Sequence, residues 1–96
     1  MSIERLDQST IESRLRELND WEQNGDAIER SLGFDSFLDA ISFINRIADL
    51  AEEADHHPEI FNVYDTIKLT LTTHDAGGLT DKDFQLAAQI DGEVHG

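Results

Sequence analysis

The sequence predicts an α+β domain in which three helices lie on one face of a four-stranded antiparallel sheet. Three segments have apolar residues at helical spacing, and the segments between them alternate apolar and polar residues as strands do. Along the chain these segments follow the order α-β-β-α-β-β-α. The 96 residues suffice for one core, so residues 1–96 are expected to form a single domain.

The first helix is expected to start at Ser9. Ser9 and Glu12 have the spacing of a capping box, in which the first side chain caps the helix and the second reaches back to it. Apolar residues then recur at helical spacing as far as Leu18, so the helix should end near Asn19.

A β-hairpin is expected next, with strands at residues 21–23 and 27–34. Asn24-Gly25 lies between them, a pair favoured where both turn residues need positive φ. Arg30 interrupts the apolar face of the second strand. We interpret it as an edge or interface position.

The long central helix has a start signal and a stop signal. Asp35 or Ser36 can cap its first turn. Pro58 disfavours helical geometry at His57 and cannot continue a helix itself, so the helix should stop near Asp55.

The apolar surface of this helix is wider than one packing contact uses. Its main stripe consists of Phe37, Ala40, Ile41, Ile44, Ile47, Ala48, Ala51 and Ala54. Leu38, Phe43 and Leu50 lie partly off that stripe. The excess predicts a subunit interface, with Phe43 or Leu50 among its contacts.

The remaining elements are a second hairpin and a last helix. A strand at residues 60–64 is expected to pair with one that starts at Thr66 and ends at His74, joined by a turn at Asp65. This pairing would return His74 towards His56-His57. Residues 80–83 should cap the last helix, with Leu86, Ala87 and Ile90 inward and residues 92–96 frayed.

The composition bounds the function. Acidic residues number 21 against 7 basic, a net charge of −14, which disfavours nucleic-acid binding. Repulsion among these carboxylates would be screened in concentrated salt, so we expect a halophilic, salt-adapted protein; the alternative is that the acidity serves solubility alone. Cysteine is absent, no apolar run approaches the ~20 residues of a membrane span, and Met1 to Arg5 begin no secretory signal. We therefore expect a cytoplasmic protein without membrane contact.

One stretch combines Glu52, His56-His57-Pro58, Tyr64, His74 and Asp83 at a distinctive spacing. This spacing resembles the signature of a known family, the pterin-4a-carbinolamine dehydratases. Further similarity lies in Asn62-Val63-Tyr64, Thr73-His74-Asp75 and Gly78-Leu79-Thr80. At position 60, where many members carry tryptophan, this chain has Ile60.

The resemblance implies a hydro-lyase that converts a 4a-hydroxytetrahydropterin into quinonoid dihydropterin and water, in tetrahydrobiopterin recycling. Histidines suit this reaction because their ordinary pKa, about 6.5, lies near neutral pH. No cofactor is required, neither metal nor redox group. The implied catalytic residues are His56, His74 and Glu52, and the implied substrate-binding residues are His57, Pro58, Thr73 and Asp75. Which histidine is the acid and which the base stays open.

The resemblance also implies partners. Members form dimers that join sheets edge to edge, and often tetramers, so a homodimer or homotetramer is expected. A pterin-dependent hydroxylase of the same pathway is a further partner that the resemblance suggests.

Other functions remain open. The chain could be a non-catalytic pterin-binding or protein-interaction module, as some members serve as a dimerisation cofactor of a transcription factor, or it could handle molybdopterin. A zinc site would use the histidines with Asp55 and Asp75, although adjacent His56 and His57 cannot both easily reach one ion. Gly77-Gly78 lacks the spacing of a phosphate-binding loop.

Overall fold

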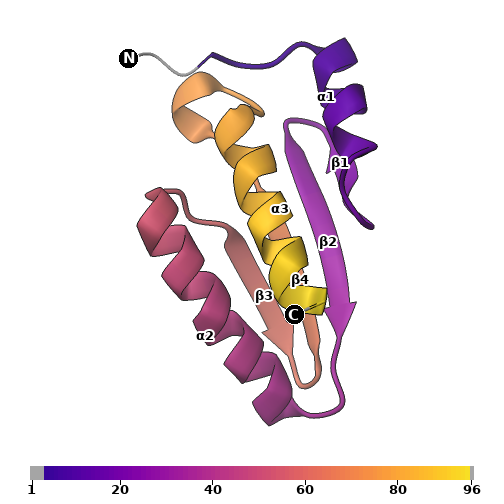
Figure 1. The fold of residues 1–96 in the computed structure, drawn as a ribbon, viewed down its shortest axis with the longest axis vertical. Helices are drawn as coiled ribbons and strands as arrows, with labels where there is room; N and C mark the ends of the chain where they lie inside the picture. The colour runs from indigo at the N-terminus through magenta and orange to yellow at the C-terminus, as the bar shows by residue number, and fades with distance from the viewer. Residues whose placement is uncertain (1–3, 96) are drawn as a thin grey trace.

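The computed structural model describes residues 4–95, with three α-helices on a four-stranded antiparallel sheet (Figure 1). This confirms the predicted fold class and element order. The elements are α1 (Gln8–Leu15), β1 (Glu22–Asn24), β2 (Ala27–Gly33), α2 (Phe37–Ala54), β3 (Glu59–Val63), β4 (Thr66–Leu71), the 3₁₀ helix η1 (His74–Ala76) and α3 (Asp81–His95). Met1–Ile3 and Gly96, on which the signal-sequence and fraying predictions partly fall, lie outside the described residues.

The strand order is β1-β2-β4-β3, with every neighbouring pair antiparallel. Strand β4 shows the predicted alternation, since Ile67, Leu69 and Leu71 are buried while Thr66 and Lys68 are exposed. Helices α2 and α3 lie side by side and run in opposite directions over one face (Figure 1).

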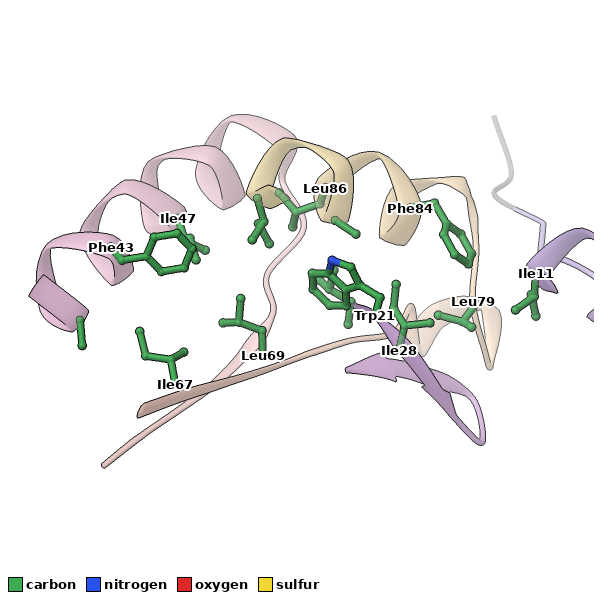
Figure 2. Packing of buried hydrophobic residues seen from close by; sticks show 14 residues of the cluster. Ile11, Trp21, Ile28, Phe43, Ile47, Ile67, Leu69, Leu79, Phe84 and Leu86 are labelled. Carbon is green, nitrogen blue, oxygen red and sulfur yellow. The ribbon is translucent and has the colours of Figure 1, made fainter. Parts of the chain in front are cut away.

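The core fills the space between this helical layer and the sheet (Figure 2). Phe43 and Ile47 reach down from α2 and Leu86 from α3, and they meet Ile67 and Leu69 of β4. Each of these side chains is at most 1 % exposed. Burial of a large apolar side chain contributes about 1.5–3 kcal/mol, so this layer fixes how the helices sit on the sheet.

The N-cap of the first helix lies two residues earlier than predicted. Asp7 is its N-cap, because Oδ1 of Asp7 accepts the backbone N–H of Thr10 at 2.8 Å. Ser9 therefore lies inside α1, and the expected capping box is wrong. The helix also ends earlier, at Leu15, although a hydrogen bond from the N–H of Leu18 to the carbonyl of Leu15 extends the turn.

The first hairpin is shifted by one residue from the prediction. Asn24 pairs with Ala27, so the two turn residues are Gly25 and Asp26 rather than Asn24 and Gly25. Gly25 has φ +61, whereas neither Asn24 nor Asp26 has a positive φ. One left-handed residue at the first turn position is enough to close this hairpin, and glycine takes that position without steric cost.

The predicted edge or interface position of Arg30 is wrong. Arg30 is 5 % exposed on β2, an internal strand, and its guanidinium donates to the Asp91 carboxylate of α3. Asp91 also accepts from Nε1 of Trp21 at 2.7 Å. The arginine tolerates burial because this carboxylate neutralises its charge inside the core.

The expected subunit contact at Phe43 is also wrong. Phe43 is 0 % exposed, and its ring centroid lies 5.0 Å from that of Phe34. Leu50 packs partly against the core. The large apolar side chains that remain exposed are Phe37, Leu38, Ile60, Phe61, Val63 and Tyr64.

The last helix is longer than expected. It continues through Gly92 to His95, so the predicted fraying from Gly92 is wrong for the residues described. Glu93 in this last turn pairs with Nε of Arg46 on α2 at 3.1 Å. Within α3, Leu86, Ala87 and Ile90 are buried as predicted.

Candidate functional site

The candidate site begins where α2 stops. Ser36 caps the helix at one end, and Asp55 ends it at the other in a left-handed conformation with φ 50. The backbone N–H of Asp55 donates to the carbonyls of Ala51 and Glu52. The N–H of His56 donates to the carbonyl of Ala51 at 3.1 Å. This reversal places His56 and His57 at the helix end, as Pro58 predicted.

His56 turns inward to a buried carboxylate. Its Nε2 lies 2.5 Å from Oδ1 of Asp83, in the first turn of α3. The side chain of Asp83 is 0 % exposed and that of His56 is 10 % exposed. Because water does not reach this carboxylate, its hydrogen bonds must come from the protein.

Asp83 receives further donors from the loop that precedes α3. Thr73 Oγ1 donates to Oδ2 of Asp83 at 2.8 Å, and the backbone N–H of Thr80 donates to the same oxygen at 3.0 Å. Thr80 Oγ1 in turn accepts the N–H of Lys82 at 3.3 Å. The side chains of Thr80 and Asp83 thus cap α3, as the sequence predicted.

The contact with Asp83 decides how the imidazole of His56 can act. An ionised carboxylate only accepts hydrogen bonds, so Nε2 of His56 carries the hydrogen that points at Asp83. Nδ1 of His56 is then the nitrogen left to give or take a proton. The same carboxylate stabilises the positive charge that forms when Nδ1 gains a proton, as in other carboxylate-histidine pairs.

His57 takes the opposite direction, onto the surface. Its Nε2 lies 2.8 Å from Oε2 of Glu52, and the two side chains are 58 % and 76 % exposed. Glu52 therefore orients His57, one turn further along the chain, and not the buried His56. An exposed pair of this kind contributes little to stability, so its value lies in holding the ring.

His74 does not end a strand as predicted. Strand β4 stops at Leu71, and His74 starts η1, within a loop that an isolated bridge between Thr73 and Gly78 closes. Gly77 completes this loop with φ 74, a conformation that glycine favours. His74 is exposed and directly follows Thr73, whose hydroxyl bonds Asp83. Asp83 thus connects the chain segments that carry His56 and His74.

The other expected site residues lie at different places. Pro58 is half-buried beside His57, and Asp75 is exposed in η1. Ile60 is partly exposed on the edge strand β3. Tyr64 is 66 % exposed in the turn between β3 and β4, at the opposite end of that hairpin from Pro58. Within this chain, therefore, Tyr64 does not join the histidines.

Sequence reasoning gave Asp83 a place in the family signature but no role in the site. The spacing of Thr80 and Asp83 indicated a helix cap. A cap explains the Asp83 carboxylate by itself, so the spacing gave no sign that Asp83 also contacts His56. Its contact with His56 spans 27 positions in the sequence, which spacing alone does not reveal.

Residues before α1 form hydrogen bonds with the loop that carries His74 and with the segment that follows it. The N–H of Leu6 donates to the carbonyl of Leu79 at 2.8 Å, and Arg5 donates to the carbonyl of Gly77 at 3.4 Å. Arg14 of α1 pairs with Asp81 of α3 at 2.5 Å. Arg5, Leu6 and Arg14 thus hold the segment before and within α1 against the loop and the first turn of α3.

Residues 4–95 show neither a membrane-spanning helix nor a metal-binding cluster. No helix among them is both long enough and apolar enough to cross a membrane. Nor does this part of the chain contain three or more histidine, aspartate or glutamate side chains grouped so that they could hold a metal ion.

Known relatives cover nearly the whole chain. The family described as pterin 4 alpha carbinolamine dehydratase matches residues 4–93. A protein of Thermomicrobium roseum named "Putative pterin-4-alpha-carbinolamine dehydratase" is 50% identical over 86 residues, which cover 90% of this chain and 92% of that protein. A protein of the same name from Halobacterium salinarum is 46% identical, over 92% of this chain and 94% of its own.

Solved structures agree. The crystal structure of a transcriptional coactivator/pterin dehydratase from Brucella melitensis superimposes with a TM-score of 0.89 at 37% identity, covering 93% of this chain and 97% of that one. A pterin dehydratase-like RuBisCO assembly factor of the alpha-carboxysome has a TM-score of 0.66 at 23% identity, over 78% of this chain and 89% of that one, a likeness of fold alone. The match over residues 4–93, the identity to these relatives and the shared fold show that the chain belongs to the pterin 4 alpha carbinolamine dehydratase family.

Proposed function

We propose that this protein is a hydro-lyase that dehydrates a 4a-hydroxytetrahydropterin to quinonoid dihydropterin and water, in tetrahydropterin recycling. The observation that carries the proposal is the pair formed by His56 and Asp83, with Nε2 of the imidazole 2.5 Å from a buried carboxylate oxygen. Such a pair holds one nitrogen of a histidine and leaves the other for proton transfer.

In the proposed reaction the carbon–oxygen bond at C4a breaks and a carbon–nitrogen double bond forms. One histidine protonates the departing hydroxyl, which leaves as water with the bonding electrons. The other takes the proton from N5, and the electron pair of that N–H bond becomes the new C4a=N5 bond. Acid and base assistance of this kind contributes about 10²–10⁴-fold to a rate. We assign the two proton transfers to His56 and His74.

We assign the pterin-binding role to His57, Pro58 and Asp75, at the same end of the molecule. His57, held by Glu52, offers a ring nitrogen for hydrogen bonding, and Pro58 offers an apolar surface beside it. Asp75 in η1 offers a carboxylate that can accept from the amino group of a pterin. The Thr73 hydroxyl already bonds Asp83, which favours a different role for it.

The proposal extends to assembly and salt. Strand β3 is an edge of the sheet, and it presents Phe61 and Val63 to the surface, so we propose that copies associate through it as a homodimer or homotetramer. A net charge of −14 and a relative in Halobacterium salinarum favour a salt-adapted enzyme, and we propose that it works in the cytoplasm. A pterin-dependent hydroxylase would supply its substrate.

The function is tested by following the loss of a 4a-hydroxytetrahydropterin in a stopped-flow spectrometer, with the protein in molar salt and treated with chelator. We expect loss faster than in buffer alone, unchanged by the chelator. Binding of a stable dihydropterin is measured in parallel. If the protein binds the dihydropterin but does not accelerate loss of the 4a-hydroxytetrahydropterin, it is a pterin-binding module and not an enzyme. An activity that the chelator abolishes would indicate a zinc site.

A further inference from the structure

The hydroxyls of Thr73 and Thr80 belong to one continuous chain of hydrogen bonds that ends at the Asp83 carboxylate, the partner of His56. Thr73 Oγ1 lies 2.8 Å from Oδ2 of Asp83 and 2.8 Å from Oγ1 of Thr80. Thr80 Oγ1 accepts the N–H of Lys82 at 3.3 Å. Thr80 is 0 % exposed and Thr73 is 7 % exposed, so water hardly competes for these bonds.

This chain of hydrogen bonds has a single direction. A hydroxyl has one hydrogen to donate, and an ionised carboxylate donates none. Thr73 donates to Asp83, so the bond between the two hydroxyls must be donated by Thr80. The chain starts at the N–H of Lys82 and reaches the carboxylate from one side, while Nε2–H of His56 reaches it from the other.

Helix capping does not account for the Thr73 hydroxyl. The cap of α3 needs the N–H of Thr80 on Asp83 and the N–H of Lys82 on the Thr80 hydroxyl, and both bonds exist without Thr73. Thr73 comes from the loop after β4, and it adds a second donor to Oδ2 of Asp83, which also accepts the N–H of Thr80. The added bond joins the loop that carries His74 to Asp83, which is the hydrogen-bond partner of His56.

We propose that Thr73 and Thr80 are positioning residues for proton transfer by His56 and His74, a proposal that rests on the dehydratase function above. The bond from Thr73 fixes the orientation of the Asp83 carboxylate, and the carboxylate fixes the ring and the tautomer of His56. Because Thr73 directly precedes His74, the same bond holds the two histidine-bearing segments in register. Neither threonine needs to touch the substrate.

The test compares three variants. Thr73→Val removes the hydroxyl and keeps the shape, whereas Thr73→Ser keeps the hydroxyl and removes the methyl group. Thr72→Val is the control, because Thr72 Oγ1 donates to the carbonyl of Asp26 at 2.6 Å, outside the chain of hydrogen bonds. For each we would measure kcat, KM and the ¹⁵N NMR signals of the His56 imidazole in the substrate-free protein, which report its tautomer.

We expect Thr73→Val to lower kcat about tenfold, the effect of one hydrogen bond, while KM changes by less than a factor of about two. Its ¹⁵N signals should show His56 divided between the two tautomers, whereas the wild-type protein shows the hydrogen on Nε2. Thr73→Ser should restore both kcat and spectrum. Thr72→Val should match the wild type in both.

A Thr73→Val protein with wild-type kcat and a wild-type spectrum would overturn the proposal. So would an equal loss in Thr72→Val. If Thr73→Val does not fold, Thr80→Val decides, since it breaks the chain one bond further from His56. Unchanged kcat and tautomer in that variant reject the proposal, and a smaller loss of the same kind supports it. The spectra need no substrate, so they remain decisive even if the wild type proves inactive.

Discussion

Nε2 of His56 lies 2.5 Å from Oδ1 of Asp83, and the side chain of Asp83 is completely buried. This contact joins the end of α2 to the start of α3, which lie next to each other over the sheet (Figure 1). Three donors converge on the one carboxylate: the His56 ring, the Thr73 hydroxyl and the Thr80 amide. Helix packing and the chemistry of the site therefore depend on the same residue.

Asp83→Asn should lower kcat by about 10²-fold or more, because the amide can present an N–H to His56 and so favour the wrong tautomer. The pterin analogue should still bind within a few-fold of wild type. Asp81→Asn is the matched control, since Asp81 lies in the same helical turn but is exposed and pairs with Arg14. Equal kcat for the wild type and Asp83→Asn would remove Asp83 from the mechanism.

Arg30→Met should destabilise the fold by about 3 kcal/mol or more, because it leaves the buried Asp91 carboxylate without its cation. The double variant Arg30→Met/Asp91→Leu should recover part of this loss. Chemical denaturation measures both. Arg46→Met serves for comparison, since its partner Glu93 is solvent-accessible and the loss there should stay below about 1 kcal/mol. Similar losses at both sites would mean that the core pair is no more important than a surface pair.

Asp7 should give α1 a pH-dependent stability. The backbone N–H of Thr10 donates to its carboxylate and lowers the pKa of Asp7 below the ordinary value of 3.8. A lowered pKa stabilises the fold above pH 3.8, and that stability is lost as the pH falls through the pKa of the folded state. Asp7→Ala should therefore lower the Tm at neutral pH, with a deficit that shrinks in acid. The serine of Asp7→Ser also caps the helix but has no charge to lose. The difference in Tm between Asp7→Ser and Asp7→Ala should therefore stay the same from neutral to acidic pH.

Salt should raise the Tm from its value in dilute buffer, because counter-ions screen the repulsion within a chain of net charge −14. Calorimetry over a range of KCl concentrations measures this. The triple variant Glu17→Gln/Glu22→Gln/Glu53→Gln removes three exposed negative charges and should depend less on salt. A Tm that is highest in dilute buffer would contradict the salt adaptation.

Local signals predicted local structure well. The stop of α2 at Asp55 follows from Pro58, which acts within a few residues, and the Ser36 cap and the alternation in β4 are equally local. Small shifts arose where two local solutions compete. Asp7 and Ser9 can both cap a helix, and Asn24-Gly25 and Gly25-Asp26 can both form a two-residue turn. In each case, packing against the rest of the fold selects the register.

The errors with chemical consequences concern contacts between distant residues. Arg30 looked like an edge residue because its partner Asp91 is 61 positions away. Phe43 seemed to lie partly off the apolar stripe of its helix because its packing partners, such as Phe34, come from other elements of the fold. The role of Asp83 depends on how α2 and α3 pack against each other. Sequence spacing indicates which residues share an element, whereas the packing of elements decides which side chains meet.

The most direct test of the central claim is the rate at which a 4a-hydroxytetrahydropterin is lost in the presence of the wild type, His57→Gln and the double variant His56→Gln/His74→Gln. All would be compared in molar salt, with binding of a stable dihydropterin measured for each. We predict acceleration by the wild type and a double variant that binds the analogue but lowers kcat by about 10²-fold or more. His57→Gln should weaken binding more than it lowers kcat. A folded double variant with the wild-type rate would contradict the account.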